Sequence, residues 1–188
     1  MMGIASSFGR WWGRSGKPAL NSTVERQAAE PEDAESQFDL GRELAGVEGE
    51  AQDYAGAAQW YLKAAGQGHC VAQFNLGLMY GQGQGVRRDE ASAGMWLRKA
   101  AESGHAGAQY HVGVRQHRAS KSGPLPEASE CRIEAFKWLE LAVMQAYRGS
   151  ESAREFVALG MTQGEVDEGG RRAAAFAAGR ARPVAPVS

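Results

Sequence analysis

Histidine and cysteine are the residue types in this sequence that offer nucleophilic or metal-binding chemistry. His69 and Cys70 are neighbours and supply the types needed for a thiol nucleophile and its base. Adjacent residues of a helix point apart, however, and no acidic residue is placed to orient the imidazole. His111 and His117 are six residues apart, whereas zinc-binding pairs on a helix are spaced at i, i+4. We therefore expect no catalytic residue, no metal site and no enzymatic activity.

A glycine-rich segment, Gly81–Gly85, is the candidate for binding a phosphate group. Its sequence is GQGQG, but no lysine followed by serine or threonine completes a phosphate-binding loop. Because the segment lies in a predicted turn between two helices, we interpret it as structural and expect no cofactor.

The charges of the chain are divided unevenly between its ends and its body. The net charge of the 188 residues is −1; residues 1–20 contribute +3 and residues 171–188 contribute +4, which leaves −8 for the rest. A repeat array that binds nucleic acid would carry its positive charge on the body. The acidic body therefore argues against nucleic acid as a partner.

The first 33 residues are rich in Gly, Ser, Pro and Arg and show no lasting periodicity, so we predict a flexible leader, 1–33. Within it, Phe8, Trp11 and Trp12 lie among basic residues. Three hypotheses account for these aromatic residues: a weak interfacial membrane anchor, a linear motif that docks onto a partner or a neighbouring copy, or a disordered tail. An anchor would make the protein a peripheral, membrane-tethered adaptor.

The compartment is predicted from signals that the sequence lacks. No run of about 18 apolar residues is present to span a bilayer, and the N-terminus has no apolar core of a signal peptide. Cys70 and Cys131 indicate free thiols rather than a disulfide framework. We expect a cytoplasmic protein.

An internal period of 36 residues organises the elements that carry the histidines, the cysteines and the glycine-rich segment. One hexapeptide, SQFDLG in its first copy, recurs in phase at three places: 36–41, 72–77 and 108–113. A second pattern, centred on Trp60, recurs after 36 residues at Trp96 and after a further 42 at Trp138, so the third unit carries six extra residues. Such a period is typical of stacked supersecondary units. The apolar spacing within each copy predicts a pair of amphipathic helices.

Glycines, prolines and capping residues mark the expected helix ends and close contacts. Glycines inside the first helix of each unit predict close approach of a neighbouring helix: Gly41, Gly77 and Gly113. Gly68 and Gly104 are expected to end second helices in the left-handed conformation. Asp89 is a predicted N-cap, Pro126 is expected in the first turn of its helix, and Thr162 with Glu165 predicts a capping box for a last helix.

The second unit resembles a Sel1-like repeat, a relative of the tetratricopeptide repeat. The residues that carry the resemblance are Leu76-Gly77-Leu78-Met79-Tyr80, Gly83, Gly85-Val86, Asp89, Ala93, Trp96, Lys99-Ala100-Ala101 and Gly104-His105. The other units depart from this pattern: Leu44 and Gln116 stand at the Tyr80 position, and Ala146-Tyr147 replaces Gly-His.

The resemblance implies an all-α, right-handed α-α superhelix. Three units are expected over 34–147, with bounds 34–69, 70–105 and 106–147, followed by C-terminal capping helices at 148–179 and a disordered tail at 180–188. It further implies a non-catalytic protein–protein interaction module or adaptor, often bacterial. Some relatives are cysteine-rich, secreted and bind β-lactam drugs, so a hydrolase is a third hypothesis, although this chain lacks their paired cysteines.

The expected partner site is the concave groove lined by the first helix of each unit. By the resemblance, two residues of each first helix face this groove and would bind a peptide or helix of the partner: Phe38, Arg42, Phe74, Leu78, Tyr110 and Val114. The alternative is that the aromatic members pack against the neighbouring unit. Arg42 has no such packing role and is the member expected to act in binding.

Overall fold

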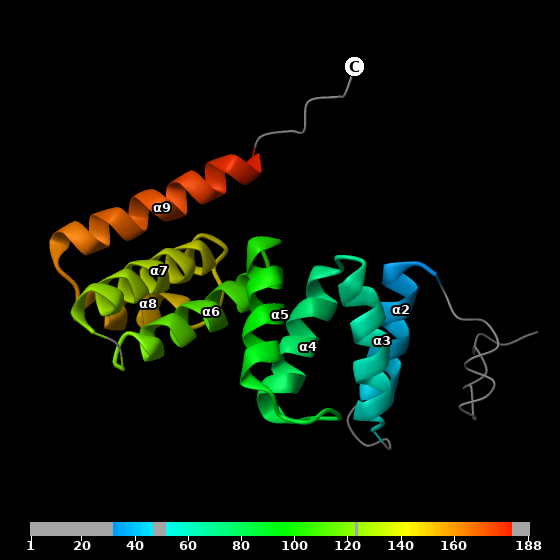
Figure 1. The fold of residues 1–188 in the computed structure, drawn as a ribbon. Coiled ribbons are helices and arrows are strands. Elements are labelled where there is room, and N and C mark those ends of the chain that lie inside the picture. Colours follow the sequence, from blue (N-terminus) through cyan, green and yellow to red (C-terminus); the bar gives the residue numbers. More distant parts are fainter. Residues whose placement is uncertain (1–31, 47–51, 123, 182–188) are drawn as a thin grey trace, which may run out of the picture. The chain divides into compact units, whose positions relative to one another are not determined.

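The computed structural model describes residues 32–46, 52–122 and 124–181. These ranges contain helices and no strand (Figure 1). The helices are α2 (Ala34–Ala45), α3 (Tyr54–Gly66), α4 (Cys70–Gln82), α5 (Glu90–Glu102), α6 (Ala106–Ala119), α7 (Leu125–Met144), α8 (Ser150–Ala158) and α9 (Gln163–Ala181). The expected all-α architecture is confirmed. The leader residues Phe8, Trp11 and Trp12 lie outside the described ranges.

Successive helices pair as the 36-residue period predicts. Each unit is an antiparallel pair, α2 with α3, α4 with α5, and α6 with α7, and neighbouring units meet where α3 contacts α4 and α5 contacts α6. We call the contacts α3–α4, α5–α6 and α7–α8 the first, middle and third seams. The six extra residues of the third unit are accommodated by α7, which has 20 residues where α5 has 13. As expected, α7 begins upstream, with Pro126 in its first turn.

Interior glycines let the two helices of each unit approach closely. A Cβ atom on Gly77 would lie 2.8 Å from Cγ of Leu97 and 3.1 Å from its backbone nitrogen. The same contact recurs in the other units, with Tyr61 against Gly41 and Leu139 against Gly113. Because any side chain would push the pair apart, the cost of about 0.5–1 kcal/mol for glycine in a helix is offset by packing.

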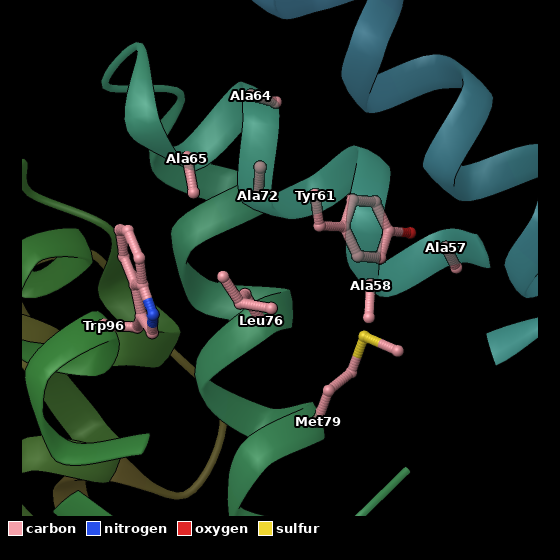
Figure 2. Close-up of a cluster of buried hydrophobic side chains, with 9 residues drawn as sticks. All are labelled: Ala57, Ala58, Tyr61, Ala64, Ala65, Ala72, Leu76, Met79 and Trp96. Carbon is pink, nitrogen blue, oxygen red and sulfur yellow. The ribbon is translucent and has the colours of Figure 1, made fainter. Parts of the chain in front are cut away.

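The core lies between helix pairs rather than in one central mass. One cluster joins the first two units through Ala57, Ala58, Tyr61, Ala64, Ala65, Ala72, Leu76, Met79 and Trp96 (Figure 2). The second cluster repeats this arrangement one unit later around Leu97, Val112 and Trp138. The recurring tryptophans thus supply large buried surface to successive layers, while alanines allow close helix contact.

Helix ends follow the repeat with one exception. Gly68 and Gly104 have φ of +91° and +88°, the left-handed conformation expected after a helix. Ala146 occupies the equivalent position of the third unit and has φ of +54°, although it is not glycine. Left-handed backbone costs an L-residue about 1–2 kcal/mol, so the third unit carries local strain here.

Buried glutamines connect successive units. Gln73 and Gln109 each donate a side-chain hydrogen bond across the boundary, to the carbonyl oxygens of Ala65 (3.1 Å) and Ala101 (3.3 Å). The side-chain oxygen of Gln109 also accepts from Gln145, 2.8 Å away. The equivalent oxygen of Gln73 is buried and has no hydrogen-bond partner within the described part of the chain.

Charged groups hold the last helix, α9, against α7 and against the end of α5. The expected capping box forms: the Thr162 N–H donates to the Glu165 carboxylate at 2.8 Å, and the Glu165 N–H donates to the Thr162 hydroxyl at 3.3 Å. The same carboxylate contacts Arg132 of α7 at 2.7 Å. Residue 180 is not the start of an irregular tail, because α9 continues to Ala181 and Arg180 donates to the backbone oxygens of Glu102 and Ser103.

Candidate partner-binding surface

Aromatic rings occupy the same position of the first helix in each unit. In α2, Phe38 stacks on Tyr61 and His69, with ring centroids 5.7 and 4.5 Å apart. In α4, Phe74 stacks on His105 at 4.3 Å. The rings stand at equivalent positions of their helices, and each contacts the histidine that caps the first helix of the next unit. Every ring is half-buried, so part of it stays accessible.

The third unit continues this series of rings. Tyr110 of α6 lies 5.4 Å from the ring of Tyr147, which stands where the earlier units have histidine. Tyr110 also meets the edge of His111, and His111 lies 5.8 Å from Phe74. A Cβ atom on Gly107 would approach Phe74, His105 and Tyr147 to 3.2 Å each, so a side chain at this position would displace the converging rings slightly.

His69 and His105 act as helix N-caps. Their Nδ1 atoms accept hydrogen bonds of 3.1 Å from the backbone N–H groups of Ala72 and Ala108. The neutral ring therefore carries its proton on Nε2. In the first unit, Nε2 of His69 lies 3.1 Å from the Glu35 carboxylate. His69 and His105 stand 36 residues apart, at equivalent positions of successive units, but the sequence carries no separate signal for capping by histidine.

Burial favours the neutral form of His105 and His111. The pKa of His105 is lowered by burial and secondarily by the charge of His111, and the pKa of His111 is lowered by burial. These rings therefore present uncharged, aromatic surface near neutral pH. Such a surface suits apolar and aromatic side chains of a partner.

The structure places the six predicted groove residues two to a helix, on α2, α4 and α6. Five are half-buried and contact the core clusters: Phe38, Phe74, Leu78, Tyr110 and Val114. The side chain of Arg42 is 68% exposed and forms an ion pair of 2.7 Å with Asp39. Each half-buried residue thus has one side on the core and one side open. Their role in partner binding stays a prediction.

The described residues offer no arrangement for metal binding and no membrane span. No group of three or more His, Cys, Asp or Glu residues in ranges 32–46, 52–122 and 124–181 is close enough to hold an ion. Among the described helices, none has the length and apolar character needed to cross a bilayer. Gly83 and Gly85 adopt positive φ in the turn after α4, the structural role expected of that segment.

Paired helices, seams built from alanine and tryptophan, and rings repeated at one position define a helical repeat array, a class of protein-interaction scaffold. The Sel1 repeat family matches residues 34–69, 70–105 and 128–147. The chain is therefore a Sel1-repeat protein. Proteins with these repeats generally act as protein-interaction modules. In the third unit the match starts at residue 128, after the insertion that interrupts the repeat.

Two solved structures share the fold. A protective antigen present in uropathogenic Escherichia coli strains, displaying an SLR fold, is 25% identical with a TM-score of 0.63; the alignment covers 83% of this chain and 34% of the antigen. A Sel1 repeat protein from Oxalobacter formigenes is 31% identical with a TM-score of 0.56, covering 78% and 55%. The chain thus spans about a third and just over half of these two proteins. No curated protein matches it.

Proposed function

We propose that the protein is a non-catalytic adaptor that binds an extended peptide or an amphipathic helix of a partner protein. The binding site is the concave face formed by the first helices α2, α4 and α6. The observation that carries this proposal is the half-buried ring at the same position of all three helices: Phe38, Phe74 and Tyr110.

Repetition and partial exposure together support a binding role. Rings that served the core alone would be fully covered, as Trp138 is at 1% exposure. Rings spaced one repeat apart suit a ligand that passes along several units, because each unit then offers an equivalent apolar contact. Aromatic residues are also the types that contribute most to protein interfaces.

Site-specific photocrosslinking tests the location of the partner. A photoreactive amino acid is placed at Arg42, on the proposed face, and in a separate variant at Met95, which is 47% exposed on the second helix α5. We expect one partner to be crosslinked from position 42 and not from position 95 in lysate of the source organism. Equal crosslinking from both positions, or crosslinking from 95 alone, contradicts the proposed face.

A pair of double variants then separates binding from folding. Phe74→Ala with Leu78→Ala removes apolar contacts from the proposed face, whereas Leu62→Ala with Met95→Ala removes exposed apolar surface from second helices. We expect the first pair to abolish crosslinking from position 42 while circular dichroism still shows a helical protein, and the second pair to leave crosslinking intact. A helical first pair that still crosslinks refutes the role of these rings.

A further inference from the structure

A pocket of about 270 Å³ lies at the middle seam, between α5 and α6. It is lined by Gly94, Arg98, Val112, Arg115, Gln116 and Ala119. Two of these residues are arginines, one from each helix. The pocket lies between the second helix of one unit and the first helix of the next. The equivalent positions at the first and third seams can therefore be compared with its lining residues.

The middle seam departs from the repeat at four positions together. At the first seam these positions are apolar, and Met79 is 5% exposed and points toward Ala58 (Figure 2). Gly94, Arg98, Arg115 and Gln116 stand 36 residues after Ala58, Leu62, Met79 and Tyr80. Arg115 places a guanidinium where the first seam has Met79, and Gly94 lacks the methyl group of Ala58. These two changes leave space between α5 and α6 and make the lining of the pocket polar.

The third seam shows how charge at such a position is normally compensated. Glu140 is equivalent to Arg98, and Arg154 is equivalent to Val112. The Arg154 guanidinium and the Glu140 carboxylate form an ion pair of 2.8 Å across that seam. At the middle seam, Arg98 faces an apolar position instead and makes no ion pair with any residue described here. Its guanidinium lies 6.0 Å from the ring of Trp138.

The second arginine is oriented by α5 and is only partly neutralised. Arg115 donates to the Glu90 carboxylate at 2.6 Å and to the Glu90 backbone oxygen at 3.0 Å. Glu90 also pairs with Arg88 at 2.8 Å, so one carboxylate is shared by two cations. A Cβ atom on Gly94 would lie 3.1 Å from Nη2 of Arg115, so the absence of a side chain there makes room for the guanidinium.

We propose that the middle-seam pocket binds an oxyanion, the phosphate or carboxylate group of a small molecule or of a partner side chain. Arg98 and Arg115 hold it from opposite helices, and Gln116 adds an amide donor. Guanidinium groups present paired N–H donors that match both kinds of oxyanion, and charge-assisted hydrogen bonds of this type are strong. Partial burial reduces competition from water and salt.

Thermal unfolding of the full chain tests the proposal with two probes, sodium phosphate and sodium acetate, each against sodium chloride at equal ionic strength. A ligand that binds the folded state raises Tm, and the rise depends on the ratio of its free concentration to Kd. An anion at ten times its Kd should raise Tm by about 3–6 °C in a chain of this size. We expect such a rise with at least one oxyanion. A rise with phosphate alone, acetate alone or both identifies the group; no rise with either overturns the proposal.

Repeat-derived variants show whether the pocket is responsible. Arg98→Leu and Arg115→Met introduce the residues that the first seam has at these positions, so the layer should remain packed. We expect each to remove the anion-dependent rise in Tm. Arg148→Leu makes the same change of charge at an exposed residue between α7 and α8 and should retain the rise. Equal anion effects in wild type and in Arg98→Leu would show binding elsewhere and would refute this site.

Discussion

Replacing Ser103 by glutamine should stabilise the protein, because it supplies a hydrogen bond that the second unit lacks. In the first and third units a glutamine at the C-cap of the second helix donates to the buried glutamine of the first helix. The two distances are 2.9 Å from Gln67 to Gln37 and 2.8 Å from Gln145 to Gln109. Ser103 holds the equivalent C-cap position in the second unit.

The expected gain follows from the unpaired oxygen of Gln73. Gln73 is 5% exposed, and its Oε1 atom is buried with no hydrogen-bond partner in the described ranges. A buried unsatisfied acceptor costs about 1–3 kcal/mol. Ordering a partly exposed glutamine side chain takes back up to about 1.5–2 kcal/mol. A net stabilisation of about 1 kcal/mol should remain, which raises Tm by about 2–4 °C in a chain of this size.

Urea and thermal unfolding of four proteins measure this effect. They are wild type, Ser103→Gln, Gln73→Met, and the double variant; Ser103→Ala serves as a control for loss of the hydroxyl. A double-mutant cycle isolates the coupling between the two side chains. We expect a favourable coupling near 1 kcal/mol. A Ser103→Gln protein no more stable than Ser103→Ala, or a coupling indistinguishable from zero, would refute the equivalence of the three units at this contact.

Three further predictions concern strain and protonation. Ala146→Gly should raise Tm by about 1–3 °C, because glycine tolerates the φ of +54°; an unchanged or lower Tm would show that no strain is stored there. Burial lowers the pKa of His105, His111 and His117, so the unfolded chain takes up these protons first and stability should fall as pH drops below about 6.5; urea unfolding at pH 7.5 and 5.5 checks this, and equal stability contradicts it. The pKa of Glu165 is lowered to about 2 by hydrogen bonds from Ser129, Thr162 and Arg132, so the ionised carboxylate stabilises the folded protein above about pH 4.5 and loses this effect toward pH 2. Glu165→Gln should therefore reduce the loss of stability between pH 4.5 and 2. An unchanged loss of stability over that range would contradict the network.

The architecture was predictable because one sequence period governs both helices of every unit. A repeat that recurs after 36 residues fixes the number of helix pairs, and the interior glycines mark where the two helices of a pair touch. Gly77 against Leu97 is such a contact. Helix ends were predictable where their chemistry is local, as at Asp89, whose carboxylate accepts from the Ala91 N–H at 2.9 Å. The family resemblance supplied the rest of the arrangement.

Contacts between units were less accessible to sequence reasoning. The period shows that Phe38 and Phe74 are equivalent but not that they stack on His69 and His105, since a ring partner 31 residues away depends on the packing of helices. The sequence showed that Ala146 departs from the Gly-His pattern of the other units, but it did not predict the positive φ of this residue. Distances across a seam depend on two helix axes, which periodicity alone does not specify.

Departures from the repeat at a seam between units indicate a role beyond packing. In a helical repeat array each unit contacts only its neighbours, so a residue that is fully buried at the equivalent position of every unit is accounted for by packing. A single departure can be absorbed, and two departures across a seam can compensate each other, as Glu140 and Arg154 do. Arg98 and Arg115 depart on both sides of the middle seam with the same sign of charge, so neither can compensate the other. Glu90 is shared with Arg88, so the oxyanion that we propose would supply the further countercharge.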